Sequence, residues 1–285
     1  MKKLVLLIFI AATLSCGHKN RIKIEDVNQN SIQKKGTPQC LDLENAIKGE
    51  YDSQPLNTFI DTVKYIALET NQACLVGRIN KVLYYKDCFY VGNFNVLLKF
   101  NSKGKFICQI GKKGKGPREY LQMRDVIIHS DSIYINGRHK ILVFNLDGEY
   151  LTEFPFPADV IDFEKLDDTF VSYNKETGNL IFLNYNNGHI IDTIEYEKIE
   201  GKRIPVSVVY PHDNLFFQNS RMFCINTGHN DTIHEIDNLH RLIPRYIINL
   251  GKFKLPDKFR VEFVNLDKFD KLSAAYIRPV LIETN

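Results

Sequence analysis

The sequence predicts an all-β fold, a β-propeller whose four-stranded antiparallel blades surround a common axis. One observation is an internal repeat, because residues 79–110 align without gaps with residues 123–154, 44 positions later. The other is the make-up of the repeat, since intervals of about 40–50 residues built from short β-type runs are typical of propeller blades. The identical pairs are Val82/Val126, Asp87/Asp131, Tyr90/Tyr134, Leu98/Leu142, Phe100/Phe144, Asn101/Asn145 and Gly104/Gly148.

The first 15 residues have the composition of a signal peptide. Lys2 and Lys3 precede an apolar run, residues 4–12, that is too short to span a bilayer. Residues 13–16, Thr-Leu-Ser-Cys, resemble a bacterial lipobox, so we expect cleavage before Cys16 and lipid on its thiol and new amino group. The alternative is an ordinary secretory signal without lipid. Either way the sequence predicts an exported protein, and the lipobox predicts an anchor in the membrane of the cell envelope.

Two further segments follow the signal. Residues 16–58 are polar and lack sustained periodicity, which predicts a tether and entry segment. Residues 59–285 form the predicted propeller domain, and the strand-like run 59–68 at its start is expected to complete the last blade and close the ring.

Strands of the first unit are expected near residues 80–85, 88–92, 96–101 and 105–110. Hairpin turns at residues 101–104 and 145–148 place glycine at the same position twice, as a backbone with positive φ requires. A third unit over residues 160–196 has one extra turn residue, and a fourth begins near Pro205. Residues 246–250 are expected to follow the fourth unit instead of belonging to it. Residues 257–275 are expected to form a short helix outside the repeat.

Residues 111–120, Gly-Lys-Lys-Gly-Lys-Gly-Pro-Arg-Glu-Tyr, resemble the G-x-x-G-x-G-P-x-E-Y linker of the NHL-like, six-bladed β-propeller lipoproteins of Gram-negative (Bacteroidota-type) bacteria. Residues 63–70 and 246–256 resemble other segments of that family. The resemblance implies six blades, whereas the sequence contains about four units, so we expect an incomplete propeller that lacks C-terminal blades. The alternative is a small closed ring of four or five blades.

Composition restricts the partners. The formal charge of +3 is small, so no nucleic-acid partner is expected, and the local basic clusters have to be judged individually. Five cysteines besides Cys16, at irregular spacing, leave at least one unpaired thiol and indicate no disulfide framework. We expect a monomer.

Two loops carry the candidate ligand-binding residues. Lys112, Lys115 and Arg118 lie among the glycines of residues 111–120, which could cradle an anion on backbone N–H groups, although the same loop can also serve as a structural crossing between blades. Arg138 and His139 lie between two strands of the second unit, where a rim loop could present them to a ligand. Ordinary exposed loop residues are the alternative for this pair.

Metal binding and catalysis have weaker support. His229, Asp231 and His234 could begin a metal site, but the two histidines point to opposite faces if they share one strand. No cofactor is expected, and neither a G-x-S-x-G nor an H-E-x-x-H motif occurs. We therefore predict an envelope-anchored binding or scaffold module for a protein or glycan ligand. The alternatives are a metal-assisted lyase or hydrolase with its site in the propeller channel, and a truncated fragment without function.

Overall fold

The structure is a computed structural model that describes residues 5–9, 37–48, 58, 60–157, 160–174, 177–196, 216–218, 223–225 and 231–254. It confirms the all-β prediction, because four sheets, each built on four consecutive antiparallel strands, follow one another in these residues, and the last carries one further strand. Short helices are confined to α1 (Leu43–Lys48) and η2 (Gly251–Phe253) in the part described. The helix expected over residues 257–275 lies outside it.

Each sheet is one blade, with its strands in sequence order. Blade 1 consists of β4 (Lys81–Tyr85), β5 (Cys88–Asn93), β6 (Val96–Asn101) and β7 (Phe106–Gln109). Blade 2 consists of β8 (Asp125–His129), β9 (Ser132–Asn136), β10 (Lys140–Asn145) and β11 (Tyr150–Pro155). Blade 3 consists of β12 (Val160–Leu166), β13 (Thr169–Asn174), β14 (Asn179–Asn184) and β15 (Ile190–Glu195).

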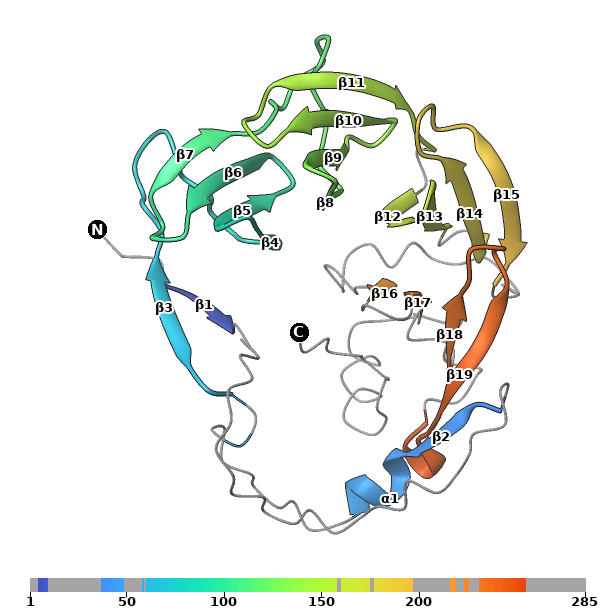
Figure 1. The fold of residues 1–285 in the computed structure, drawn as a ribbon. Helices are drawn as coiled ribbons and strands as arrows, with labels where there is room; N and C mark the ends of the chain where they lie inside the picture. Colours follow the sequence, from blue (N-terminus) through green and yellow to red (C-terminus); the bar gives the residue numbers. More distant parts are fainter. Residues whose placement is uncertain are drawn as a thin grey trace, which may run out of the picture.

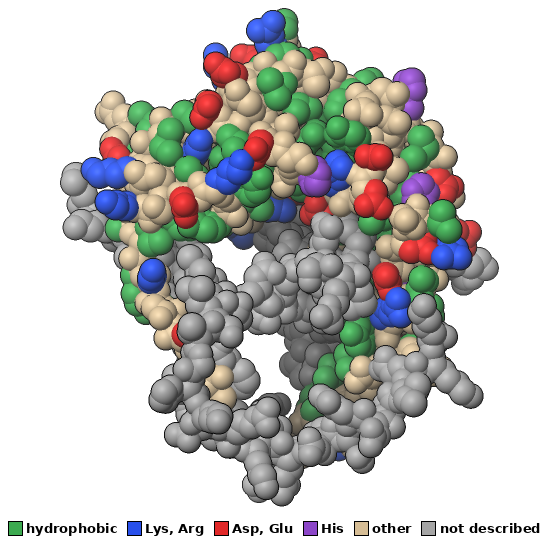
Figure 2. Space-filling view, in the orientation of Figure 1, with side chains coloured by type: hydrophobic (Ala, Val, Ile, Leu, Met, Phe, Trp, Pro, Cys, Tyr) green, Lys and Arg blue, Asp and Glu red, His purple; other side chains and the backbone are tan. Residues whose placement is uncertain are grey.

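Blade 4 consists of β16 (Phe216–Gln218), β17 (Phe223–Ile225), β18 (Thr232–Ile236) and β19 (Leu242–Asn249). The separation of residues 246–250 from the fourth unit is therefore wrong, because residues 246–249 belong to its fourth strand, β19. In Figure 1 the first strand of every blade lies on the inner side of the arc and the fourth on the outer side. The face seen in Figure 2 carries interspersed acidic and basic side chains over the blades, in keeping with the small net charge.

Equivalent hairpin turns join the third and fourth strands of the blades. The Gly104 N–H donates to the carbonyl of Asn101 (2.9 Å), and the Gly148 N–H donates to that of Asn145 (3.1 Å). Blade 3 has the predicted extra residue, since the Gly188 N–H reaches back to Asn184 (2.8 Å). In blade 4 the glycine position is taken by His240, at φ +58°. The positive φ inferred from the repeated glycines is thus confirmed, at +78° for Gly104 and +85° for Gly148.

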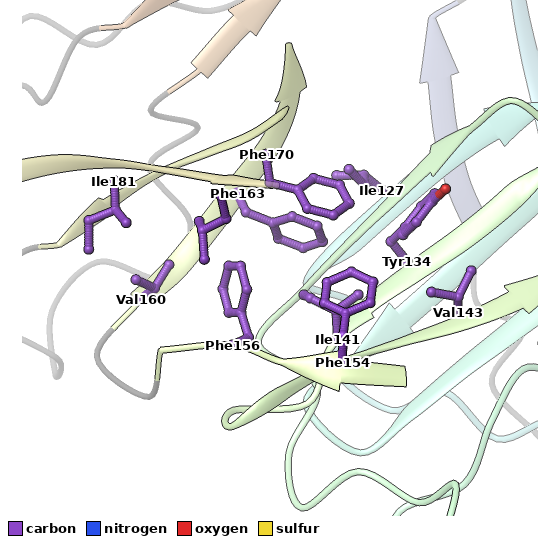
Figure 3. Packing of buried hydrophobic residues seen from close by; sticks show 11 residues of the cluster. Ile127, Tyr134, Ile141, Val143, Phe154, Phe156, Val160, Phe163, Phe170 and Ile181 are labelled. Atoms are coloured by element: carbon purple, nitrogen blue, oxygen red, sulfur yellow. The ribbon is translucent and has the colours of Figure 1, made fainter. Parts of the chain in front are cut away.

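Apolar clusters between neighbouring blades form the core. In Figure 3, Phe154 and Phe156, at the end of blade 2 and just after it, meet Phe163 and Phe170 of blade 3. The rings of Phe163 and Phe170 pack edge to face with centroids 5.4 Å apart, an arrangement favoured by the aromatic quadrupole. The consecutive apolar residues of β6, β10 and β14 are buried on both faces, as the sequence pattern indicated.

The hairpin glycines rest on the outermost strand that precedes them. A Cβ on Gly188 would lie 2.2 Å from the carbonyl oxygen of Pro155 in β11, and one on Gly148 would lie 3.3 Å from that of Gln109 in β7. The same contact recurs at Gly104, whose Cβ would lie 2.2 Å from the carbonyl oxygen of Ala67 in β3 (Val63–Ala67). We conclude that β3 takes the position of the outermost strand of a blade preceding blade 1.

The strand β3 has an unexpected partner. It pairs antiparallel with β1 (Val5–Phe9), which lies inside the predicted signal peptide, and the two form a separate two-stranded sheet. Figure 1 shows β1 on the inner side of β3. The sequence predicted that residues 59–68 complete the last blade. The described strands do not show this, because β3 pairs with β1, but β3 does occupy the position of an outermost strand.

The predicted tether also contains regular structure. Strand β2 (Gln39–Asp42) joins blade 4 as a fifth strand, parallel to β19, and α1 follows it directly. Leu41 and Ile47 pack against the buried face of blade 4. This packing was not predictable from the sequence, because the segment is polar and, in its described residues 37–48, Leu41 and Ile47 are the side chains that pack on the core.

We predict that Gly104→Ala destabilises the protein by about 2–3 kcal/mol, because a Cβ there combines positive φ with a clash against backbone. Gly148→Ala is the matched control, with similar φ and looser contacts, and we expect a loss of about 1 kcal/mol. Urea unfolding followed by circular dichroism measures both. Equal losses would contradict the close approach of β3 to blade 1.

Candidate functional site

One side of the propeller carries the loops that cross between blades and the loops between second and third strands. We call this side the crossing face and the opposite side, which carries the hairpin turns, the turn face. On the crossing face, the Met123 N–H donates to the carbonyl of Phe94 (2.9 Å) and the Lys113 ammonium donates to Oδ1 of Asn95 (2.6 Å). These bonds tie the crossing loop between blades 1 and 2 to the loop between β5 and β6.

The glycines of the 111–120 loop surround a carboxylate of the chain itself. Oε2 of Glu119 accepts a hydrogen bond from the Gly116 N–H (2.8 Å), and a Cβ on Gly114 would lie 1.9 Å from the same oxygen. The Gly114 N–H donates to the carbonyl of Tyr120 (3.0 Å), and the Tyr120 N–H donates to that of Lys112 (3.0 Å). The anion cradle considered from the sequence is therefore occupied from within, and the loop closes on itself.

The basic side chains of this loop point away from that closed centre. The Lys112 side chain is 77% exposed and its ammonium lies 3.6 Å from Glu119, a contact too long and too exposed to fix it. Lys115 and Arg118 are exposed as well. Arg118, at φ +60°, places its guanidinium 5.0 Å from the ring centre of Tyr150 on the outermost strand of blade 2.

Tyr120 fastens the loop to both blades. Its side chain is fully buried, its hydroxyl donates to the carbonyl of Asn95 (3.3 Å), and burial raises its pKa to about 12. A Cβ on Gly137 would lie 3.0 Å from the Cβ of Tyr120, so the loop that carries Arg138 and His139 abuts it. The structure thus brings the two predicted binding loops together at Tyr120.

The Arg138–His139 loop is held by buried polar groups. The Arg138 N–H donates to Oδ1 of Asn136 (3.0 Å), and the fully buried Asn136 donates through Nδ2 to the carbonyl of Val160 (3.3 Å). The His139 carbonyl accepts the N–H of Phe156 (2.9 Å). Both side chains remain exposed. The loop therefore offers a cation and an imidazole from a fixed backbone.

A charged group on the innermost strands was missed by the sequence reasoning. The Lys81 ammonium of β4 binds Oδ1 of Asp125 in β8 at 2.8 Å, and Oδ2 of Asp125 accepts the N–H of Phe163 in β12 (3.3 Å). Burial opposes the charge, but Asp125, Glu164 and Asp162 together raise the pKa of Lys81. This pair could have been predicted from the repeat, because Lys81 and Asp125 occupy equivalent positions in neighbouring units, 44 residues apart.

The weak metal candidates have other partners. His234 lies 3.2 Å from the Tyr196 hydroxyl through Nδ1, and burial lowers its pKa. Asp231 forms an ion pair with Lys254. His229 lies outside the described residues. Within the described part of the chain, no group of three or more His, Cys, Asp and Glu side chains is placed to hold a metal ion.

Cys16, the predicted lipidation site, also lies outside the described residues. Five cysteines that the structure does describe are free thiols: Cys40, Cys74, Cys88, Cys108 and Cys224. Among the helices in the described ranges, none has the length and apolar character needed to cross a membrane.

Comparison with known proteins places the chain in a family. Residues 38–281 match the family described as "Domain of unknown function (DUF4934)". The chain belongs to the DUF4934 family. No curated protein matches it.

Solved structures resemble this DUF4934 chain in fold. A putative exported protein from Bacteroides fragilis is 18% identical, with a TM-score of 0.59 over 86% of this chain and 67% of its own. BamB from Moraxella catarrhalis is 11% identical (TM-score 0.39; 65% of this chain, 58% of its own). Streptogramin B lyase is 14% identical (TM-score 0.41; 58% of this chain, 53% of its own). The chain thus spans only part of the length of each.

We predict that Glu119→Ala destabilises the DUF4934 chain by about 1–2 kcal/mol, because the Gly116 N–H loses a charged acceptor inside a half-buried loop. It should also speed proteolytic cleavage within residues 111–118. Lys112→Ala is the control and should cost less than about 0.5 kcal/mol. Limited trypsin digestion and urea unfolding measure both effects, and a stable, uncleaved Glu119→Ala would contradict the account of the loop.

We predict that His234 lowers stability in mild acid. Its pKa is depressed in the folded state, so the unfolded chain protonates first, and stability is lost as the pH falls below about 6.5. His234→Gln should reduce the loss of melting temperature between pH 7.5 and pH 5.5 by about 2 °C. Differential scanning calorimetry measures this, and an unchanged pH profile would refute the role of His234.

Proposed function

We propose that this DUF4934 protein is an exported, lipid-anchored binding module of the cell envelope. Its ligand, a protein or a glycan, contacts the crossing face through Lys112, Lys115, Arg118, Arg138 and His139. The propeller acts as the rigid support, and binding rather than chemistry is the activity proposed for this surface.

The observation that carries the proposal is the way in which these side chains are presented. Their backbone is fixed by the internal carboxylate of Glu119, the buried ring of Tyr120 and the buried amide of Asn136, while the charged ends are exposed. A preorganised surface binds with a smaller loss of conformational entropy than a mobile one. Loops held by a rigid scaffold are also where binding residues are concentrated in proteins.

Export and anchoring rest on the sequence. The charged start, the short apolar run and the lipobox-like residues 13–16 support both. The similar structure from Bacteroides fragilis is described as a putative exported protein, which agrees with export. The six-bladed form of the propeller is part of the same proposal, because the family resemblance implies it.

We do not propose the lyase or hydrolase alternative. The carboxylate of Asp125 is the inward group whose contacts link three blades, and it already binds the Lys81 ammonium and the Phe163 N–H. A paired carboxylate of this kind fastens the inner strands of blades 1, 2 and 3 to one another.

Anchoring has a direct test in cells that make the full chain. Labelled palmitate should be incorporated into the wild type and not into Cys16→Ser, and the variant should move from the membrane to the soluble fraction. Thr13→Leu is the matched control, since it brings the lipobox closer to its usual form and should keep the label. Labelling of Cys16→Ser would refute lipid attachment at this residue.

Ligand binding can be tested with an array of purified acidic and neutral glycans. The variant Lys112→Ala, Lys115→Ala, Arg138→Ala should lose at least about tenfold in affinity for any glycan that the wild type retains, because charged contacts at an interface contribute strongly to binding. A variant with Lys103→Ala and Lys105→Ala, on the turn face, should bind as the wild type does. Equal binding by all three proteins would overturn the assignment of the crossing face.

A further inference from the structure

Three exposed apolar side chains lie on linked loops of the crossing face. Leu75 is 68% exposed, Phe94 38% and Leu121 40%. The Asn93 amide donates to the carbonyl of Val76, beside Leu75, and the Met123 N–H donates to the carbonyl of Phe94 (2.9 Å). These bonds join the loops of all three residues, which we call the apolar trio. Several large exposed apolar side chains on linked loops of one surface indicate an interaction site.

The basic 111–120 loop borders the apolar trio. Its Lys113 ammonium donates to Oδ1 of Asn95 (2.6 Å), next to Phe94, and its Tyr120 hydroxyl donates to the carbonyl of the same Asn95 (3.3 Å). Leu121 follows the loop directly in the sequence. Cations and exposed apolar residues therefore lie on adjoining loops of the crossing face.

Charge is unequal on the two sides of the propeller. In the crossing-face loops that the structure describes, the basic residues are Arg78, Lys112, Lys113, Lys115, Arg118, Arg124, Arg138, Lys252 and Lys254 and the acidic ones are Glu69, Glu119 and Asp231. The carboxylates of Glu69 and Glu119 are turned onto the N–H groups of Phe106 (3.1 Å) and Gly116 (2.8 Å), and Asp231 forms an ion pair with Lys254.

The turn face has the opposite balance in the described hairpins. Its acidic residues are Asp87, Asp131, Asp147, Glu149, Asp167, Asp168 and Asp237, and its basic residues are Lys86, Lys103, Lys105 and Arg241. In the described loops, charge is thus distributed unequally between the two faces although the net charge of the whole chain is small.

We propose that the crossing face of blades 1 and 2 docks on an anionic lipid surface, with the apolar trio entering the headgroup region and the basic loop binding lipid phosphates. The inference rests on the proposed envelope location, which brings the chain to a membrane. Cations combined with exposed Phe and Leu side chains are the composition of interfacial lipid-binding surfaces. Lys112 and Lys115 also belong to the proposed protein or glycan site. An acidic glycan engages such cations alone, whereas the apolar trio beside them adds a contact that a lipid surface provides.

The two contributions are complementary. Lysine and arginine near an anionic leaflet are attracted within a Debye length of the surface, and apolar side chains gain from entry into the acyl boundary. The expected lipid attaches the chain through one residue, Cys16, which leaves the orientation of the propeller open, and a second contact of this kind would fix that orientation. The turn face would then point away from the bilayer.

The experiment uses the chain from Gly17 onward, which lacks Cys16 and so separates surface docking from lipid anchoring. Sedimentation with phosphatidylcholine vesicles containing phosphatidylglycerol is compared with phosphatidylcholine alone. Lys112→Glu with Lys115→Glu should weaken binding to the anionic vesicles at least about tenfold. Lys103→Glu with Lys105→Glu is the matched control on the turn face and should change it less than about twofold.

A fluorescent reporter tests the insertion of the apolar trio. The chain contains no tryptophan, so Phe94→Trp supplies a single probe, and Leu239→Trp supplies a control on the turn face, where Leu239 is 67% exposed. Emission of the Phe94→Trp protein should shift to the blue on anionic vesicles and that of the Leu239→Trp protein should not. If the chain from Gly17 fails to fold, the two reporters are compared in the full chain.

Three results would overturn the proposal. They are equal sedimentation with neutral and anionic vesicles, an unshifted Phe94→Trp emission despite binding, and a blue shift of both reporters. Binding of dextran sulfate in preference to vesicles would indicate an acidic glycan instead. Failure of palmitate labelling at Cys16 would refute the anchor and leave the vesicle result standing by itself, so the two proposals can fail separately.

Discussion

Each blade has two apolar faces, and every face must be covered for the sheet to exist in water. Within the arc, neighbouring blades cover one another, but among the described residues one face of blade 1 and one face of blade 4 meet no further four-stranded blade. Leu68, Cys74 and Val76 cover the end face of blade 1, and Leu41 and Ile47 cover that of blade 4. Burial of apolar area contributes roughly 25 cal/mol per Å². These short N-terminal segments therefore stabilise the end blades by burying part of the apolar surface that a neighbouring blade would bury. The positions of β2, α1 and β3 all follow from this requirement.

Much of the fold could be predicted because the repeat reflects the same requirement. Tyr90 and Tyr134, Phe100 and Phe144, and the paired hairpin glycines occupy equivalent buried or turn positions in blades 1 and 2, so selection for packing leaves them alike. What the sequence could not show depends on single contacts between distant segments. Leu41 packs on blade 4 from a polar stretch, and β3 is identified as an outermost strand only by the contact of Ala67 with Gly104.

The candidate site was also predictable only in part. The glycines of residues 111–120 identify the loop, but the sequence does not show which charges face outward. Only the structure shows that Glu119 fills the loop and that Lys112 and Lys115 remain outside it. The ligand role of Lys112, Lys115, Arg118, Arg138 and His139 stays a prediction. The Lys81–Asp125 ion pair is not predictable from identities in the repeat, because residues of opposite charge occupy the equivalent positions. The apolar trio was not predictable either, since Leu75, Phe94 and Leu121 are far apart in sequence and single exposed apolar residues are common in loops.

The bulges of the outer strands have a consequence for how such a protein survives at high local concentration. In blades 1, 2 and 3 the pairing of the third and fourth strands shifts at the same place, and Ile107, Leu151 and Ile191 are the extra residues, each about half exposed. A straight edge with these side chains would invite a second molecule to extend the sheet. The bulge interrupts the regular spacing of hydrogen-bonding groups that sheet extension between molecules requires. Molecules at high concentration can therefore remain separate although their outer strands expose apolar side chains.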